Sequence, residues 1–345
     1  MMNKLKIYIL AFALSFSSLS IFSQPVKEVY EEWPAKDISK LTIDNKFGTI
    51  YIEKTNDELI RIEASFDIEN LSKSNAEYLA RQVRFNFDKS GHTVSSKTSF
   101  TNDFKTSQNF EIILKVRIPD NIELNIENSY GNVYMPDFEG KTNLTIEYGN
   151  LEAGKLTCDS SPVKLSLKYG KAILNEAHNL DADINYAELR VKKTGETNLN
   201  SKYSIIEINT TSQIELESNF DHISIETVDF IKSTSNYSHF AIDRINKSLE
   251  LIMKHGDYKV QNVSTTIQTI EIDNTYGELF LNMPENLTYY LDSETYYTDL
   301  KYPDGTIIAQ KVTGDFIKSS TKIGDGDSNS KIIVKSRFGI VHLTK

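Results

Sequence analysis

The chain has 345 residues, a formal net charge of -10 and a single cysteine, Cys158. An acidic chain is a poor candidate for nucleic-acid binding, which needs clustered lysine and arginine, so we expect no nucleic-acid partner. One cysteine excludes an intramolecular disulfide. Stability therefore has to come from packing and backbone pairing.

Residues 1–23 have the three-part layout of a secretory signal peptide. Lys4 and Lys6 precede an apolar run over residues 7–22, and small and polar residues follow. Cleavage near residues 23–24 would change the net charge from -10 to -12, because only those two lysines are charged in the segment removed. An uncleaved anchor is the alternative, although the run is short and serine-rich for a membrane span. No later segment could cross a membrane, so we expect an extracytoplasmic protein, in the periplasm, on the cell surface or secreted.

Most of the remaining chain repeats one short pattern. The stretch "SNFDHISIE" at 218–226 returns as "SNYSHFAID" at 235–243, and alignment on the third residue extends the pattern along the chain. The steps between these register residues are 17 to 21 residues from position 130 to position 296. The register residues are Phe47, Tyr130, Tyr148, Tyr169, Tyr186, Tyr203, Phe220, Tyr237, His255, Tyr276, Tyr296 and Phe338.

Each repeat unit reads as strand, corner, strand and return turn. Apolar residues alternate before the register residue and again after it, which is typical of half-buried strands. The apolar residues lie at even offsets before the register residue and at odd offsets after it. In a straight strand the two sets would face opposite sides, so the chain has to bend between them for both to face one core. Glycine follows the register residue in seven of the twelve units and reaches positive φ without steric cost, so we expect it to form the corner.

Units of this length without a helical pattern predict an all-β fold, a β-solenoid of stacked coils of about 17–21 residues, since one unit cannot bury its apolar face alone. Equivalent positions on neighbouring coils would lie about 4.8 Å apart, and the register aromatics would form a stacked ladder. The expected segments are a signal peptide (1–23), an N-terminal segment with the first coil (24–54), an insertion (55–120), the β-solenoid repeats (121–302) and an irregular loop with the last coil (303–345).

The insertion departs from the repeat. Residues 72–85, "SKSNAEYLARQVRF", have helical spacing of apolar residues behind a serine cap, and residues 109–119, "NFEIILKVRIP", have the composition of a strand. We therefore expect a short helix and strands that cap the N-terminal end of the stack, because an open sheet edge would recruit other chains.

Two patterns resemble metal sites, and each has a simpler interpretation. His222, His239 and Asp257 occupy the same register position on three successive coils, where imidazole and carboxylate could bind a metal, but a solvated polar stripe explains them too. Residues 324–330, "GDGDSNS", begin like a calcium loop but lack its later glycine and glutamate, so a turn is the better interpretation. We expect no cofactor.

Tyrosines gather late in the chain and are the best candidates for a ligand surface. Exposed rings can stack on sugar faces or anchor a protein partner. Some of them belong to the ladder. The candidate ligand residues are Tyr289, Tyr290, Tyr297 and Tyr302.

We find no catalytic signature. The acidic residues are spread along the coils rather than gathered as in polysaccharide-cleaving β-solenoids, and no GxSxG or HExxH motif is present. The sequence therefore predicts a chain that is not an enzyme and has no catalytic residues.

The repeats "SYGNVYM", "EYGNLEA", "KYGKAIL" and "TYGELFL", the opening "IDNKFGTIYIE" and the closing "SRFGIVHL" resemble the exported bacterial β-solenoid families known as adhesins or auto-transporter adhesin head domains. The resemblance covers roughly residues 40–345 and implies an extracytoplasmic protein without established catalytic residues. The leading hypothesis is an adhesin-like or structural protein of the cell envelope, whose partner is an envelope or extracellular protein or a glycan. The alternatives are a carbohydrate-binding or polysaccharide-processing β-helix protein and an envelope sensor acting through the insertion.

Overall fold

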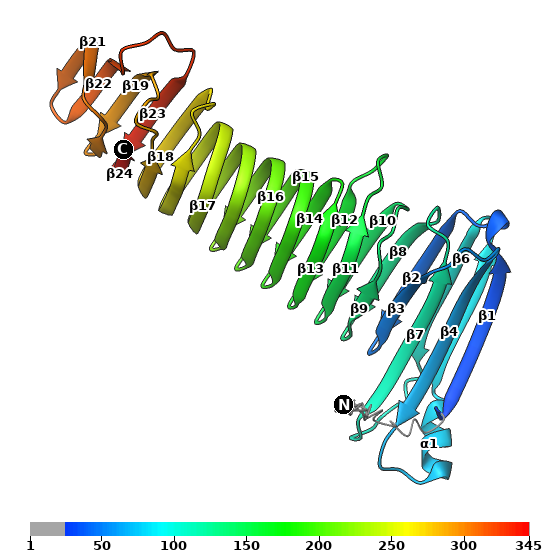
Figure 1. Ribbon diagram of the computed structural model, residues 1–345. Coiled ribbons are helices and arrows are strands. Elements are labelled where there is room, and N and C mark those ends of the chain that lie inside the picture. Colours follow the sequence, from blue (N-terminus) through cyan, green and yellow to red (C-terminus); the bar gives the residue numbers. More distant parts are fainter. Residues whose placement is uncertain (1–24, 345) are drawn as a thin grey trace, which may run out of the picture.

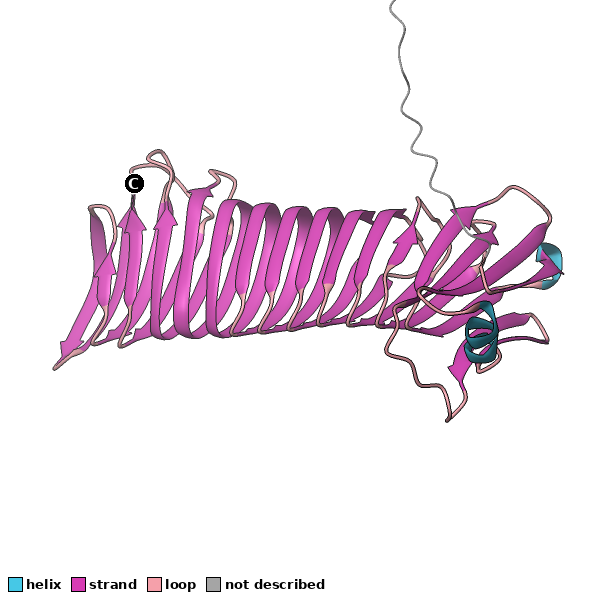
Figure 2. Cartoon of the chain, turned by 90° about the horizontal axis from the view of Figure 1, so that it is seen from below, coloured by secondary structure: helices cyan, strands magenta, loops and turns pink. Residues whose placement is uncertain are grey.

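The computed structural model describes residues 25–344, which form a long row of strands with one short helix near its N-terminal end (Figures 1 and 2). The chain is nearly all β, and its 24 strands belong to one open sheet, so the all-β prediction is confirmed. The predicted signal peptide lies outside the described residues. Within residues 25–344, no helix has the length and apolarity needed to cross a membrane.

The central stack consists of two parallel ladders, because each coil contributes one strand before the bend and one after it. Strands before the bend pair in the order β8, β10, β12, β14, and strands after it pair in the order β9, β11, β13, β15. β15 and β16 each continue around the return turn and are interrupted at the bend, whereas β17 and β18 also continue through the bend. The bounds are β8 (Glu123–Ser129), β9 (Val133–Met135), β10 (Thr142–Glu147), β11 (Asn150–Leu156), β12 (Val163–Lys168), β13 (Lys171–Ala177), β14 (Leu180–Asn185), β15 (Glu188–Lys202), β16 (Ile205–Asn219), β17 (His222–Val263) and β18 (Thr269–Asn282).

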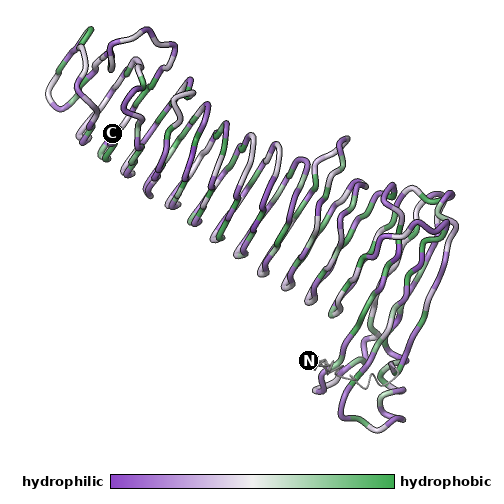
Figure 3. Tube along the Cα trace, in the orientation of Figure 1, coloured by the Kyte–Doolittle hydropathy of each residue, from purple (hydrophilic) through white to green (hydrophobic). Residues whose placement is uncertain are grey.

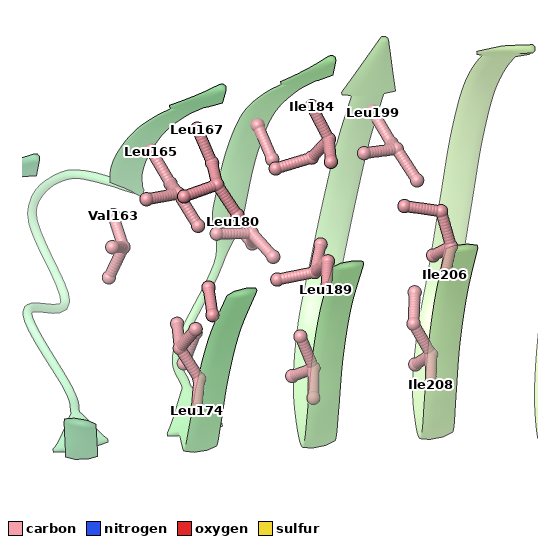
Figure 4. Packing of buried hydrophobic residues seen from close by; sticks show 14 of the residues in the cluster. Val163, Leu165, Leu167, Leu174, Leu180, Ile184, Leu189, Leu199, Ile206 and Ile208 are labelled. Atoms are coloured by element: carbon pink, nitrogen blue, oxygen red, sulfur yellow. The ribbon is translucent and has the colours of Figure 1, made fainter. Parts of the chain in front are cut away.

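The core lies between the two ladders. Leu165 and Leu167 point inward from one ladder and Leu174 and Leu189 from the other, and all four are buried (Figure 4). Hydrophilic and hydrophobic residues alternate along the coils (Figure 3). Because parallel pairing repeats at an offset of 17, 18 or 21 residues, as between Leu189 and Ile206, apolar residues stack in columns. No unit could bury these side chains without its neighbours.

The bend falls on the register residue and not on the glycine after it. All twelve register residues have positive φ, between 47° and 61°, with Tyr297 in the place expected for Tyr296. Of the seven glycines that follow a register residue, only Gly256 has positive φ. The prediction that glycine supplies the left-handed conformation was therefore wrong for the other six.

Three of these glycines, Gly131, Gly149 and Gly170, lie where the backbones of successive coils approach closely. A Cβ atom on Gly149 would lie 1.9 Å from the carbonyl oxygen of Gly131, and one on Gly170 would lie 1.8 Å from that of Gly149. Both positions are far inside van der Waals contact. Glycine therefore permits backbone to stack on backbone at this side of the bend.

The interior of the bend is polar in the middle coils. Asp221 is fully buried and accepts hydrogen bonds from the hydroxyls of Ser201 (2.8 Å) and Ser218 (2.7 Å) and from the backbone N–H groups of Ser204 (2.7 Å) and Asn219 (3.0 Å). A buried carboxyl without such partners would cost several kcal/mol. Ser201 and Ser218 occupy the register position that holds Ile146, Leu167 and Ile184 in earlier coils, so this hydrogen-bond network replaces apolar packing there.

The insertion extends both ladders at the N-terminal end. β6 pairs with β2 and with β5, while β7 pairs with β3 and with β4, and β1 forms the outer edge against β4. The helix predicted within 72–85 and the strand predicted at 109–119 are confirmed as α1 and β7. The bounds are β1 (Lys27–Pro34), a 3-10 turn (Ala35–Asp37), β2 (Lys40–Lys46), β3 (Thr49–Lys54), β4 (Leu59–Ile68), α1 (Lys73–Ala80), β5 (Val83–Ser90), β6 (Thr93–Phe100) and β7 (Phe110–Ile118).

At the C-terminal end the order in space differs from the order in sequence. β23 and β24 pair with β18 on one side and with β19 and β20 on the other, so the final coil of the chain is not the last coil of the stack. The segment predicted to be an irregular loop contains a hairpin of β21 and β22, which continues the sheet beyond β19. The bounds are β19 (Tyr289–Tyr296), β20 (Asp299–Lys301), β21 (Gly305–Thr313), β22 (Phe316–Ile323), β23 (Lys331–Arg337) and β24 (Ile340–Thr344).

The close approach of the coils predicts that Gly149→Ala is strongly destabilising. The added methyl group has to displace backbone, and we expect a loss of about 3 kcal/mol in the free energy of unfolding. Gly326→Ala is the matched control, because the nearest atom to its new Cβ is 3.6 Å away. Urea unfolding followed by circular dichroism measures both variants, and equal midpoints would contradict the role assigned to Gly149.

Candidate functional site

The register residues form one continuous column of rings on the outside of the stack. Centroids of neighbouring rings are 4.5 to 5.7 Å apart, and their planes lie within 20° of each other. The predicted ladder is confirmed with one correction. Tyr297 stacks on Phe338 at 13°, whereas Tyr296 meets it edge-on at 87°. The aromatic ladder thus runs from Phe47, through Phe338, to Tyr297.

The aromatic ladder is exposed at ring edges and covered at ring faces. Its eleven phenylalanine and tyrosine members have exposed fractions of 40% to 56%. Because each ring lies flat against its neighbours, what remains exposed is the ring edge. A sugar ring therefore finds no open aromatic face along the column. Of the two end rings, Phe47 is also met edge-on by Phe100 and Phe110, whereas Tyr297 has a face beyond its contact with Phe338 that no further ladder ring covers.

Strain and stacking oppose each other at every register position. An L-residue in the left-handed region costs about 1–2 kcal/mol, and an aromatic pair contributes about 0.5–1.5 kcal/mol beyond burial. An inner ring such as Tyr186 makes two such contacts. Stacking on both sides thus offsets the cost of the bend.

The charged residues beside the ladder are paired between coils. Opposite charges on adjacent strands contribute tenths of a kcal/mol and require no binding role. These pairs follow the stack and do not converge on a cleft. Examples are Lys168 with Glu147 (3.4 Å), Lys171 with Glu188 (3.1 Å) and Lys232 with Glu215 (2.8 Å).

The four tyrosines proposed as a ligand surface do not share one face. Tyr289 is only 1% exposed, and burial raises the pKa of its hydroxyl, so including it in an exposed surface was wrong. Tyr290, its neighbour on β19, points to the opposite side of the strand and is 37% exposed. Tyr297 ends the aromatic ladder, and Tyr302 is partly buried against the core. Binding by these last three residues stays a prediction.

The candidate metal residues lie close together but do not form a complete ligand set. The rings of His222 and His239 are 5.0 Å apart, and Nδ1 of His239 contacts the carboxylate of Asp257. Among residues 25–344, no group of three or more His, Cys, Asp or Glu side chains is arranged to hold a metal ion. Residues 324–330 connect β22 to β23 as a turn and loop.

A groove lies at the C-terminal end of the sheet. It has a volume of about 510 Å³ and is lined by residues of β19, β21, β22 and β23. Lys318 pairs with Glu294 at 2.6 Å, and the hydroxyl of Ser320 donates to Asp292 at 2.8 Å. The sequence did not indicate this groove, because it depends on a hairpin that was expected to be an irregular loop.

No protein-family model matches the chain, and no curated protein matches it. The solved structures similar to it include the following three. One is a "putative cell adhesion protein" from Clostridium sporogenes, at 12% identity and a TM-score of 0.20, covering 93% of this chain and 99% of that chain. The others are each a "putative adhesin". The one from Parabacteroides merdae has 13% identity and a TM-score of 0.30, and the match covers 75% of this chain and 92% of that chain. The one from Bacteroides fragilis has 10% identity and a TM-score of 0.28, and the match covers 92% of this chain and 96% of that chain. At such TM-scores the similarity carries no argument about fold or function.

The balance of strain and stacking predicts that, at Tyr186, a glycine variant is more stable than an alanine variant, which is the reverse of the usual order in a strand. Tyr186→Ala loses both stacked contacts and keeps a side chain in the left-handed region, whereas Tyr186→Gly loses the contacts and relieves the strain. We expect the glycine variant to be more stable than the alanine variant by about 1 kcal/mol.

Asn198, exposed on β15 with ordinary φ, is the matched control. There the glycine variant should be less stable than the alanine variant by about 0.5–1 kcal/mol. Thermal unfolding of the four proteins measures both differences. The same order at both positions would contradict the proposed strain.

Proposed function

We propose that the chain is a non-catalytic, exported β-solenoid that serves the bacterial cell envelope as an adhesin-like or structural interaction protein. The observation that carries this proposal is the long outer surface of stacked rings and paired charges. A surface of repeated coils offers many equivalent contacts to an extended partner. Catalysis instead requires a few groups to converge on one reacting bond.

The arrangement of acidic residues supports a binding role over polysaccharide cleavage. Glycoside hydrolysis requires two carboxyl groups flanking one bond, separated by about 5–9.5 Å and with different proton affinities. Several outer carboxylates of the middle coils instead pair with lysines of an adjacent coil, as Glu188 does with Lys171. Lys171 and Lys193 lower the pKa of Glu188 and Glu176 respectively, which favours the ionised form over a proton donor.

Carbohydrate binding is the second candidate, and the end of the aromatic ladder favours it. Tyr297 has one ring face beyond the last ladder contact, is 56% exposed and adjoins Tyr296 edge-on. Such a corner can receive one sugar ring. The molecule would have one site of this kind, at the Tyr297 end of the aromatic ladder, whereas the ladder itself offers many equivalent positions.

The proposal predicts that mature protein, residues 24–345, binds an extracellular or envelope protein saturably and turns over no glycan. We would measure binding to arrays of glycans and extracellular matrix proteins, together with reducing-sugar release. The variant Tyr290→Ala/Tyr297→Ala/Tyr302→Ala tests the late tyrosines. Tyr30→Ala is the control, because Tyr30 is also exposed but lies on β1 at the far end (Figure 1).

Release of reducing sugar from any polysaccharide would overturn the non-catalytic role. Glycan binding that the triple variant loses and Tyr30→Ala keeps would establish the carbohydrate-binding alternative. Fractionation of cells that express the full chain tests its export, and a cytoplasmic product would contradict that part of the proposal.

A further inference from the structure

β21 is an open sheet edge at the C-terminal end of the stack (Figure 1). It pairs with β22 on one side, and no pairing is described on the other. All nine of its residues are exposed, and three apolar side chains, Ile307, Ile308 and Val312, have exposed fractions of 54% to 61%. A long, exposed, apolar edge strand is a template for pairing with another chain.

The other end of the molecule is protected against such pairing. The edge strand β1 has the sequence KEVYEEWP, with four charged residues and a terminal proline, and β5 carries Arg84, Asp88 and Lys89. Charges and proline are the usual means of blocking an edge. β21 has the sequence GTIIAQKVT, in which Lys311 is the only charge and proline is absent. The two ends of the stack therefore differ in their capacity to pair.

The hairpin geometry identifies the backbone groups that face the open edge. β21 and β22 are joined by Gly314 and Asp315, with φ of +59° at Gly314, so Thr313 and Phe316 close a two-residue turn. Thr313 and Phe316 exchange two backbone hydrogen bonds, and from there residue pairs alternate between hydrogen-bonded and non-hydrogen-bonded. The N–H and C=O groups of Val312 and Gln310 consequently point away from β22.

We propose that two copies of this chain pair through β21, antiparallel, about a two-fold axis at Gln310. An axis at Lys311 would place two lysines directly opposite each other, which is unfavourable. An axis at Gln310 instead places Lys311 opposite Ala309, and the outward backbone groups of Gln310 meet their own copies, within the regular part of β21 that ends at the bulge at Ile308. A two-fold contact of one surface with itself is the commonest form of homodimer.

The charge distribution also favours a second copy at this end. Mature chains are strongly acidic and repel each other, but residues 303–323 contain three lysines and two aspartates. Two copies that meet here face little net charge at the contact. Pairing would join the two stacks tail to tail into one continuous sheet, with the protected N-terminal ends outermost. This inference goes beyond the proposed function and does not depend on it.

Sedimentation velocity of residues 24–345 tests the proposal, and we expect a dimer with twice the monomer mass at micromolar concentration. Gln310→Pro removes an outward N–H without removing a bond to β22, and Ile308→Lys adds a charge at the edge. Both variants should sediment as monomers. Ile252→Lys is the control, because Ile252 is similarly exposed but lies on β17, and it should remain a dimer. Circular dichroism checks that each variant is folded.

A cysteine at the axis tests the register. In a Cys158→Ser background, Gln310→Cys should form an intermolecular disulfide under mild oxidation, because Cα atoms of a hydrogen-bonded pair lie about 5.5 Å apart. Tyr30→Cys should form none. A monomeric wild type, or a dimer that persists in both edge variants, would overturn the proposal. A dimer lost in the edge variants without the Gln310→Cys crosslink would overturn the register at Gln310.

Discussion

Parallel pairing of each coil on the preceding one is the constraint on which the rest of this structure depends. Once the offset of 17 to 21 residues between neighbouring coils is set, as between Leu180 and Thr197, each side chain of a paired strand stacks on its counterpart one coil away. Columns of similar residues follow, mostly apolar inside and aromatic at the bend, while oppositely charged residues on the outside pair between neighbouring coils. The cost of any unfavourable conformation is repeated in each coil, so it has to be offset in each coil as well.

The bend shows how that repetition is sustained. A bulky residue in the left-handed region is unfavourable alone, yet twelve such residues occur in one column because each ring covers the next. Behind the ring, six of the seven glycines have no left-handed φ, and three of them, Gly131, Gly149 and Gly170, let backbone pass close to backbone. Inside the bend, Asp221 and its serine donors replace apolar packing with a satisfied hydrogen-bond network. The bend is thus stabilised by ring stacking outside, by close backbone packing at glycines and by buried hydrogen bonds inside.

A stack of coils necessarily has two ends, and the chain treats them differently. The insertion between β3 and β8 covers the first coil with charged edge strands and a helix. At the other end the chain turns back, inserts β23 and β24 inside the stack, and leaves the nearly uncharged β21 outermost. The middle of the molecule is therefore uniform, and its distinctive surfaces, namely the Tyr297 corner, the groove and the open edge, all gather near the C-terminal end.

The amino-acid sequence alone determined the repeat, the strand content, the helix at α1 and the ladder, because period and side-chain alternation are local properties of the chain. It placed the last ladder residue one position early, at Tyr296, since two adjacent tyrosines satisfy the same pattern. It also placed Tyr289 on the surface, although strand alternation turns that ring inward. Only the tertiary structure decided which residue carries positive φ, which coil comes last in space and which edge stays open. Those features depend on pairing between segments far apart in the sequence, such as β19 with β23, and local patterns do not encode that pairing.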